Sequence, residues 1–244
     1  MTGAKAVAAL RARGFVGLRV VPDVHGDATG FAHAIHGAAA AGLYVVQLGD
    51  LTDYGPDSPE VLRLMFAVLD AGRGQFILGN HDHKLRRALV GQRVRMATEG
   101  LGRTLEQLGD APDGEALAQR TIDEVAKAPA WLRIGSWLFV HGGYHPGMLH
   151  SEAPPHAGAT KPEPVVTRAL FGQVTGRTRQ DGYPERLVDW VDRIPAGMTV
   201  YCGHDRRSLD GRPFVQAGIA GGRAVFMDTG AGKGGHLSWV DLPL

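Results

Sequence analysis

Residues 43–53 read LYVVQLGDLTD, and this stretch decides the fold. An apolar run of strand type leads into Gly49, and two carboxylates, Asp50 and Asp53, follow it closely. Because glycine has no side chain, the backbone at this point can approach a ligand closely. The pattern is typical of a strand that delivers a carboxylate to one rim of a sheet. We therefore expect a strand at 43–48 and a functional loop at 49–58.

Four other stretches repeat this arrangement of an apolar run followed by glycine-flanked polar residues. They are LRVVP before Asp23-Val24-His25-Gly26, GQFIL before Gly79-Asn80-His81-Asp82, WLFV before His141-Gly142-Gly143, and MTVY before Cys202-Gly203-His204. Together the five stretches offer enough oxygen and nitrogen donors for two metal ions close together. Such a pair of ions is suited to moving a phosphoryl group.

Strands and helices alternate through the first part of the chain. Strands are expected at 18–22, 43–48 and 75–78, with helices at 30–41 and 59–71 between them. Asp57 and Ser58 are suited to cap the second helix ahead of Pro59. Alternation of this kind predicts a parallel sheet whose sites lie at the carboxyl ends of its strands.

The rest of the chain is expected to add a helical insertion and further strands. Residues 83–128 show a helical pattern and predict a helical cap beside the site, inserted in one domain that spans residues 1–244. Later elements are expected as strands at 136–140 and 198–202, a mobile loop at 151–164 and a helix at 186–195. Residues 223–243 predict two antiparallel strands joined by a Gly-rich turn.

Composition restricts the class of protein. The chain is 44% hydrophobic and 21% charged, as expected of a globular domain, and its net charge of +1 argues against broad attraction to nucleic acid or membrane. The single cysteine, Cys202, excludes an intrachain disulfide and fits a reducing compartment. We find no stretch long enough to cross a bilayer and no convincing signal peptide. We therefore expect a cytoplasmic protein with no membrane association, and the sequence gives no evidence for a stable protein partner.

The five polar stretches, taken in order, resemble the signature of the calcineurin-like metallophosphoesterases, and within them the phosphoprotein-phosphatase branch. That signature reads D-x-H-G, G-D-x-x-D-x-G, G-N-H-D or G-N-H-E, a strand ending in His-Gly, and a late Gly-His. The resemblance implies an α/β fold: a central β-sandwich of two mixed sheets, flanked by helices, with a helical insertion near the active site. Beyond this signature, Asn80–Leu85, which extends the third stretch, and Arg168–Gly172 resemble the phosphatase domain of bacterial polynucleotide kinase-phosphatases.

The resemblance also implies a metal centre. The implied metal ligands are Asp23, His25, Asp50, Asn80, His141 and His204, with Asp50 bridging two ions. Asp23 and His25 lie two residues apart, so in an extended segment their side chains point the same way. Amide and imidazole donors suit Mn, Fe, Zn, Co or Ni better than Ca. We expect two divalent or trivalent transition-metal ions, with Mn favoured.

His81 and Asp53 are the implied acid pair. His81 would protonate the leaving oxygen while Asp53 holds its ring. The expected reaction is in-line attack on phosphorus by a hydroxide that bridges the two ions. Asp228, in the stretch FMDTG, matches the family's late I-D-T-G and is expected either to support ligands or substrate, or only to open a turn.

The chain departs from the family pattern at two positions. Tyr54 stands where the family has an arginine that grips the substrate phosphate, and a hydroxyl brings no charge. Asp205 replaces the usual threonine after His204, and would either repel dianionic substrates or pair with Arg206. These changes would favour diesters or cyclic phosphates unless other cations compensate. The candidates are Arg86, Arg87, Arg177, Arg206 and Arg207.

The predicted function is hydrolysis of phosphomonoesters, phosphodiesters or both, with nucleotides, cyclic phosphates or RNA ends as substrates. The alternatives are a serine/threonine protein phosphatase and a dinucleoside-polyphosphate hydrolase. A non-catalytic metal-binding protein on the same fold is disfavoured, because every polar stretch keeps its ligand type. A basic cluster in 83–128 is either a solvated helix face or a path for a phosphate backbone. It consists of Lys84, Arg86, Arg87, Arg93, Arg95 and Arg103.

Overall fold

The computed structural model describes residues 3–180, 182, 184–208 and 210–244. The strands are β1 (Gly17–Val21), β2 (Leu43–Gln47), β3 (Gly74–Phe76), β4 (Trp131–Ile134), β5 (Trp137–Val140), β6 (Gln173–Thr178), β7 (Pro184–Leu187), β8 (Thr199–Cys202), β9 (Phe214–Ala217), β10 (Arg223–Phe226) and β11 (Val240–Pro243). The α-helices are α1 (Gly3–Ala12), α2 (Ala28–Ala40), α3 (Ser58–Asp70), α4 (Asn80–Leu89), α5 (Arg103–Asp110), α6 (Gly114–Lys127) and α7 (Pro164–Phe171). Shorter helical turns are η1 (Thr98–Gly102), η2 (Pro146–Leu149), η3 (Ala157–Ala159) and η4 (Asp189–Arg193).

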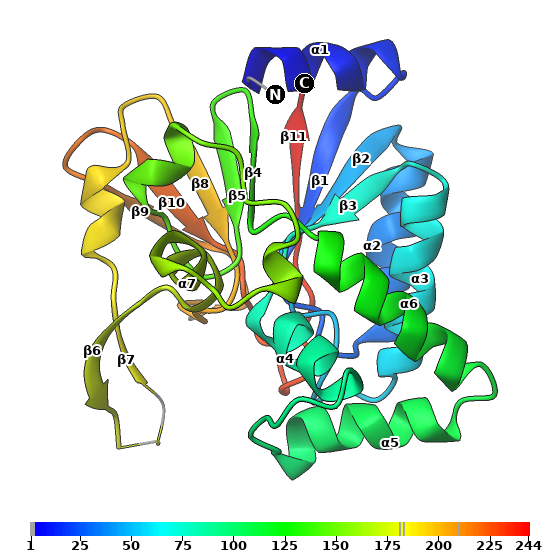
Figure 1. The fold of residues 1–244 in the computed structure, drawn as a ribbon. Helices are drawn as coiled ribbons and strands as arrows, with labels where there is room; N and C mark the ends of the chain where they lie inside the picture. Colours follow the sequence, from blue (N-terminus) through cyan, green and yellow to red (C-terminus); the bar gives the residue numbers. More distant parts are fainter. Residues whose placement is uncertain (1–2, 181, 183, 209) are drawn as a thin grey trace.

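Two mixed sheets pack against each other as a sandwich (Figure 1). The first has the order β11-β1-β2-β3, with β1, β2 and β3 parallel and β11 antiparallel to β1. The second has the order β4-β5-β8-β10-β9, in which β5, β8 and β10 are parallel. β6 and β7 form a separate hairpin at the lower end of the view. The predicted fold class, α/β with two mixed sheets flanked by helices, is confirmed.

Alternate residues of the strands fill the space between the sheets. Leu18 and Val46 of the first sheet share one buried cluster with Phe139 and Tyr201 of the second. The rings of Phe139 and Tyr201 stack with their centroids 5.6 Å apart. Because successive side chains of a strand point to opposite faces, the intervening residues pack outward against helices. This alternation explains why the central strands read as continuous apolar runs: both of their faces are covered.

Helices cover the outer faces of both sheets and one end of the sandwich (Figure 1). Phe31 of α2 and Met65 of α3 are buried in the cluster that also contains Val45 of the first sheet. Leu170 of α7 belongs to the same cluster. α1 lies across the top of the view and buries Leu10 among the residues between the sheets. The lower end, towards which the parallel strands run, carries the loops that follow these strands, together with α4, α5 and the β6–β7 hairpin (Figure 1).

The C-terminal prediction was wrong in its pairing. Residues 223–243 do not form a hairpin, because β10 lies in the second sheet and β11 pairs with β1 in the first. Arg19 of β1 is buried and holds Asp241 of β11 with two hydrogen bonds of 2.7 and 2.6 Å. The Gly-rich segment between these strands therefore crosses from one sheet to the other.

The helix expected at 186–195 was also wrong. The segment begins within β7 and continues as the 3₁₀ turn η4. Its apolar residues Val188, Val191 and Ile194 recur every third residue. A spacing of three places side chains above one another in a 3₁₀ helix, and Val191 and Ile194 are fully buried.

The segment 83–128 contains most of α4, then η1, α5 and α6. α4 begins at Asn80, inside one of the polar stretches, so this segment is joined directly to the rim where the strands end. That it acts as a cap over a substrate stays a prediction. Over the part of the chain that the structure describes, we find no helix with the length and apolar character needed to span a membrane.

Candidate metal centre

The polar residues that follow six parallel strands meet at one rim of the sandwich. They are Asp23 after β1, Asp50 after β2, Asn80 after β3, His141 after β5, His204 after β8 and Asp228 after β10. Carboxyl ends of parallel strands lie at the same edge of a sheet. The parallel strands of both sheets end at the same rim. Side chains that can donate to a metal therefore come together there from both sheets.

The loops at this rim adopt a backbone conformation that is uncommon outside glycine. Six described residues other than glycine have positive φ, and five of them lie here with φ between 46° and 77°. These five are His25, Asp50, Asp53, Tyr54 and His204. Strained conformations of this kind persist where the surroundings enforce them, and they gather at functional sites. Gly49 has φ +92°, and a Cβ there would lie 2.6 Å from Gly79 Cα, so two ligand loops touch only because both residues are glycine.

Asp50 lies at the centre of the donors. Its Oδ2 is 3.4 Å from Nε2 of His141, 3.8 Å from Nε2 of His25 and 3.9 Å from Nε2 of His81. Its Oδ1 accepts a 2.9 Å hydrogen bond from the backbone N–H of His81. One carboxylate oxygen surrounded by three imidazole nitrogens has the position that a ligand shared by two ions requires.

Two groups of potential ligand atoms share Asp50. His25, Asp50 and His81 form one, and Asp50, His141 and His204 form the other, with the atoms of each group within 4.8 Å of one another. Asn80 Oδ1 adds to the second group, because it lies 2.9 Å from His141 Nε2. The described structure thus brings all six predicted ligands together, although Asp23 joins neither group of three.

The imidazoles are oriented for metal binding by the backbone. Nδ1 of His25 lies 2.9 Å from the carbonyl oxygen of Thr52, and Nδ1 of His141 lies 2.8 Å from that of Leu48. A carbonyl oxygen can only accept a hydrogen bond, so each Nδ1 carries the proton when the ring is neutral. Nε2 is then left as the ligand atom. Nε2 of His25 and of His204 are buried without a hydrogen-bond partner among the described residues. Leaving a buried polar atom unpaired costs about 1–3 kcal/mol, so the orphaned Nε2 of His25 fits a donor to an ion. His204 faces the other ligands through Nδ1, which lies 3.1 Å from Nε2 of His141.

Asp23 ties the two sheets together at the rim. Its carboxylate accepts from the backbone N–H of His204, at 3.0 Å for Oδ1 and 3.1 Å for Oδ2. A Cβ on Gly203 would overlap this carboxylate, so glycine is required beside the ligand. Burial and the neighbouring charge of Asp228 raise the pKa of Asp23 well above its usual value. A cation in the site would offset this repulsion.

Two histidines show opposite electrostatic behaviour. Burial, assisted by the charge of Lys233, lowers the pKa of His25 to about 3, so this ring is neutral and available as a ligand. Burial acts to lower the pKa of His141, but the carboxylates of Asp50 and Asp23 and the carbonyl of Leu48 together outweigh it and raise that pKa to about 9. Without a metal, His141 therefore holds a proton at neutral pH that an ion must displace.

His81 and Asp53 form the contact expected of an acid pair. Nδ1 of His81 lies 2.5 Å from Oδ2 of Asp53, which turns Nε2 towards Asp50. Thr104 of α5 fixes the carboxylate, because its hydroxyl donates to Asp53 Oδ1 at 2.8 Å and accepts from the Asp53 backbone N–H at 3.0 Å. Lys84 lies 3.8 Å from the same carboxylate. The orientation suits His81 as a proton donor or as a donor to an ion.

Asp82 has a role that the sequence analysis missed. Its buried carboxylate accepts from the backbone N–H groups of Asp50 at 2.8 Å, Leu51 at 3.0 Å and Gly79 at 3.0 Å. Burial and the charge of Asp50 raise the pKa of Asp82 to about 6. This residue fixes the two ligand loops relative to each other. The sequence feature that could have indicated this role is the position of Asp82 as the last residue of Gly-Asn-His-Asp.

Tyr54 and Lys233 flank the centre on one side. The ring centroid of Tyr54 is 5.1 Å from that of His25 and 5.5 Å from that of His81. Lys233, which the sequence analysis did not single out, places its ammonium 4.4 Å from the Tyr54 ring centroid. Asp228 accepts from the backbone N–H of Gly230 at 2.8 Å, so it opens the turn that leads to Lys233.

The arginines proposed to bind phosphate differ in their contacts. Arg86 donates to the carbonyl of Ile122 in α6, and Arg87 binds Gln92 in the loop after α4. Arg177 pairs with Glu185 across the β6–β7 hairpin, and its side chain is 79% exposed. All three side chains therefore contact segments outside the five polar stretches.

The two arginines that follow Asp205 behave differently. Arg206 packs its guanidinium against Gly230, beside the turn that Asp228 opens. Arg207 donates to Asp205 at 2.9 Å, and Arg186 lies 3.9 Å from the same carboxylate. The charge of Asp205 is therefore paired, by Arg207 and Arg186 rather than by the expected Arg206.

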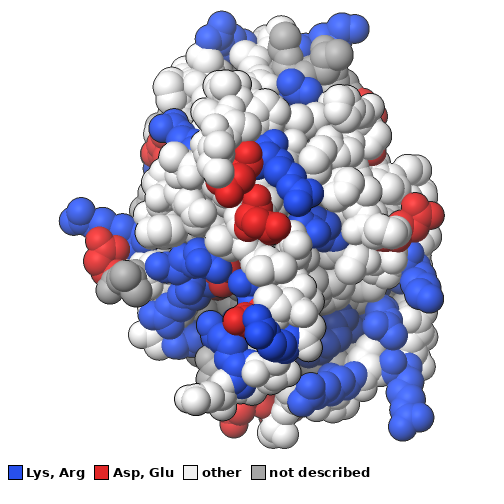
Figure 2. Space-filling view, turned by 90° about the vertical axis from the view of Figure 1, so that its left-hand side faces the viewer, with Lys and Arg blue, Asp and Glu red and all other residues white. Residues whose placement is uncertain are grey.

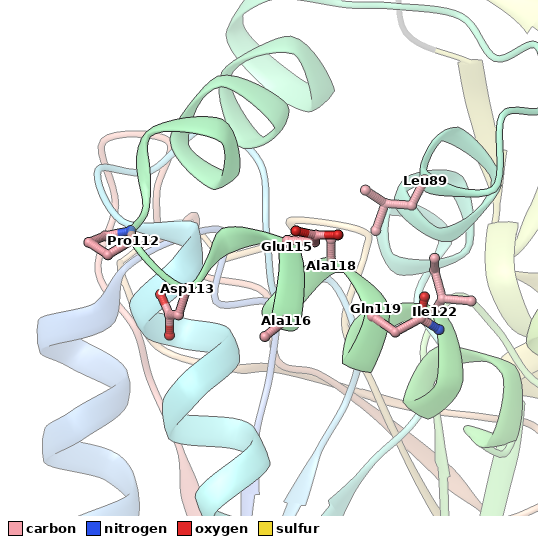
Figure 3. Close-up of a pocket in the computed structure, with 8 residues that line it drawn as sticks. All are labelled: Leu89, Pro112, Asp113, Glu115, Ala116, Ala118, Gln119 and Ile122. Atoms are coloured by element: carbon pink, nitrogen blue, oxygen red, sulfur yellow. The ribbon is translucent and has the colours of Figure 1, made fainter.

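A separate hollow of about 580 Å³ lies along α6. Figure 3 shows the side chains that line it, from Leu89 to Ile122. Of its two carboxylates, Asp113 and Glu115, the first is already paired with Arg63 through hydrogen bonds of 2.9 and 2.5 Å. The lining contains no imidazole, so this hollow lacks the donors gathered at the rim.

Asp82→Ala should destabilise the metal-free protein. The change leaves three buried N–H groups without an acceptor, so we expect the free energy of unfolding to fall by about 3 kcal/mol or more. Urea denaturation measures the loss. Asp57→Ala is the control, because this carboxylate accepts one N–H at the exposed start of α3, a contact worth about 1 kcal/mol. Equal losses in the two variants would contradict the assigned role of Asp82.

Metal binding should release protons. Because the pKa of His141 is raised to about 9 in the metal-free protein, its proton must leave when an ion binds at pH 7. Titration calorimetry with Mn²⁺ in buffers of different ionisation enthalpy should show about one proton or more released. His36→Gln, at an exposed position of α2, should leave this number unchanged. A heat that does not depend on the buffer would rule out His141 as a ligand.

Comparison with known proteins agrees with the geometry. The family model for calcineurin-like phosphoesterases matches residues 18–205. The chain is 30% identical over 198 residues to the asymmetrical bis(5′-nucleosyl)-tetraphosphatase PrpE of Geobacillus thermodenitrificans, covering 80% of this chain and 74% of the relative. It is 28% identical to the protein of the same name from Bacillus subtilis over 206 residues, covering 83% and 77%.

Solved structures share the fold. One provisionally assigned as a diadenosine tetraphosphatase superposes with a TM-score of 0.56 at 22% identity, covering 94% of both chains. A protein serine/threonine phosphatase from Saccharomyces cerevisiae superposes with a TM-score of 0.57 at 14% identity, covering 94% of this chain and 80% of that one. At these identities the likeness shows the fold alone. With the family match over most of its length, the chain belongs to the calcineurin-like phosphoesterases, hydrolases that act on phosphoester bonds.

Proposed function

We propose that this protein is a dinucleoside-polyphosphate hydrolase that cleaves a bis(5′-nucleosyl) tetraphosphate asymmetrically, giving a nucleoside triphosphate and a nucleoside monophosphate. The two donor groups that share Asp50 support the phosphoesterase chemistry. The names of the sequence relatives support the substrate class. These names favour a dinucleoside-polyphosphate hydrolase, which was an alternative prediction from the sequence. They disfavour the main prediction, hydrolysis of nucleotide or RNA-end esters.

The charge of the molecule supports a polyanionic substrate. Figure 2 shows that Lys and Arg outnumber acidic side chains over the lower half of the face that carries the second sheet. The lower end is also where α4 and the β6–β7 hairpin lie, next to the ends of the parallel strands (Figure 1). Positive potential around a site raises the local concentration of an anionic substrate, although the net charge of the chain is only +1.

We assign the ligands as the sequence predicted. Asp23, His25, Asp50, Asn80, His141 and His204 hold two transition-metal ions in this proposal, and manganese is the proposed metal. Carboxylate, amide and neutral imidazole donors suit such ions. When bound, a pair of ions supplies positive charge to phosphoryl oxygens and lowers the pKa of water.

The acid pair completes the proposed site. Asp53 accepts the Nδ1 proton of His81 and thereby fixes the ring with Nε2 facing the centre. Nε2 of His81 can then give its proton to the oxygen that leaves phosphorus. Thr104 holds Asp53 in place, so α5 contributes to the orientation of the acid.

The products of diadenosine tetraphosphate test the substrate directly. Metal-stripped protein, resupplied with Mn, Ni, Co, Zn or Fe, should yield ATP and AMP in equal amounts by anion-exchange chromatography. ADP as the sole product would contradict asymmetric cleavage. Faster turnover of a phosphopeptide or of 2′,3′-cyclic AMP would assign the protein to another substrate class. Asp50→Asn should be inactive with every metal.

Replacing His81 should separate substrates by leaving group. An alkoxide needs a proton to leave, whereas a nitrophenolate leaves without one. His81→Ala should therefore lower kcat on glycerol phosphate about 100-fold or more, but under about tenfold on para-nitrophenyl phosphate. The exposed control His36→Ala should change neither rate. Equal losses on the two esters would exclude His81 as the acid.

A further inference from the structure

The chain lacks a cation at position 54, yet its proposed substrate carries several negative charges. Tyr54 lies beside the candidate ligands, with its ring centroid 5.1 Å from that of His25. A phenol can donate one hydrogen bond but offers no charge to a phosphate. A cation must therefore reach this side of the centre from another segment if phosphate is to be held here.

We propose that Lys233 supplies the cationic contact to the substrate phosphate on the Tyr54 side of the centre. Its ammonium lies 4.4 Å from the centroid of the Tyr54 ring. The ring itself is in contact with both His25 and His81, so Lys233 is one side chain away from the metal ligands. This inference rests on the proposed function and names a residue that determines its substrate affinity.

The segment around Lys233 is fixed rather than free. The backbone N–H groups of Lys233 and Gly235 both donate to the carbonyl of Gly230, at 3.0 and 2.8 Å. The hydroxyl of Thr229 donates to the carbonyl of His236 at 2.6 Å and closes the turn. Gly232 has φ +69°, and a Cβ there would overlap the His25 carbonyl. The turn is therefore pressed against a ligand loop.

The electrostatics agree with this placement. The charge of Lys233 acts on three groups of the centre, because it contributes to lowering the pKa of His25 and opposes the raised pKa values of Asp23 and Asp228. Lys233 is exposed, and no carboxylate forms an ion pair with it among the residues that the structure describes. A substrate phosphate would meet an unpaired ammonium.

The contact with Tyr54 is weak enough to be exchanged. A cation over an aromatic ring gains less free energy than a charge-assisted hydrogen bond to a phosphate oxygen does. The ammonium can therefore turn from the ring to a phosphate oxygen at little cost. A lysine does so as a flexible point charge, unlike the planar fork of an arginine.

Charge-selective kinetics test this inference. Lys233→Met should raise KM for para-nitrophenyl phosphate, a dianion, about tenfold, because it removes a charge-assisted contact and keeps the side-chain length. The KM for bis-para-nitrophenyl phosphate, a monoanion, should rise about threefold or less, because coulombic attraction scales with substrate charge. The kcat on either ester should change by less than about threefold. Lys233→Arg should retain most of the affinity. The control Lys161→Met, in an exposed loop, should behave as the parent chain.

A second variant distinguishes the loss of the Lys233 charge from a structural disruption of the turn. Tyr54→Arg introduced together with Lys233→Met should restore KM on the dianion, because it returns a charge to this side. Equal losses on both esters, or a loss that Tyr54→Arg does not repair, would show that Lys233 is only structural. No change in KM would likewise overturn the inference.

Phosphate binding separates this inference from the proposed function. Calorimetric titration of the Mn-loaded chain with inorganic phosphate should give a Kd about tenfold weaker in Lys233→Met than in the parent. If the parent hydrolyses no tetraphosphate but this difference is found, the substrate proposal fails and Lys233 stands. If ATP and AMP are formed but phosphate binds both chains equally, the proposed function stands and the Lys233 inference fails. A parent chain that binds no phosphate contradicts the inference outright.

Discussion

The burial of several like charges around Asp50 is the constraint on which the rest of the structure depends. Asp23, Asp50 and Asp82 are all at most 2% exposed, and they lie within one small region. Charges of one sign cannot share a dry site unless cations or hydrogen-bond donors compensate them. Here Asp82 receives backbone N–H groups, and Asp50 receives the protonated His141 in the metal-free chain. Metal ions would take over that compensation in the working protein.

The architecture follows from the need to bring these groups together. Two mixed sheets are arranged so that parallel strands of each finish at one rim, and each finishing loop carries at least one donor. The loops must turn sharply, which explains the positive φ of Asp50 and His204 and the glycines between them. The close approach of Gly49 to Gly79 leaves no space for a side chain. The strain of the loops is therefore supported by the packed sandwich behind them.

The sequence predicts the parts that repeat a local pattern. Apolar runs ending in a glycine and a polar residue indicated β1, β2, β3, β5 and β8, and the resemblance supplied the candidate ligands that the rim gathers. The features that the sequence could not predict depend on contacts between distant segments. The pairing of β11 with β1 rests on Arg19 and Asp241, which are 222 residues apart. Lys233 and Thr104 meet the site only because their segments pack there, and no local pattern marks either residue. Arg86 and Arg87 show the reverse, because they follow His81 closely in sequence but bind Ile122 and Gln92.

Counting bound ions tests the central claim, that Asp50 is shared by two metals. The measurement is native mass spectrometry of the chain after metal removal and reloading with Mn²⁺, made in parallel on Asp50→Asn and on Asp205→Asn, whose parent carboxylate is already paired with Arg207. The account predicts two ions on the parent chain, two on Asp205→Asn, and the loss of at least one on Asp50→Asn. A single ion on the parent chain, or two ions retained by Asp50→Asn, would contradict it.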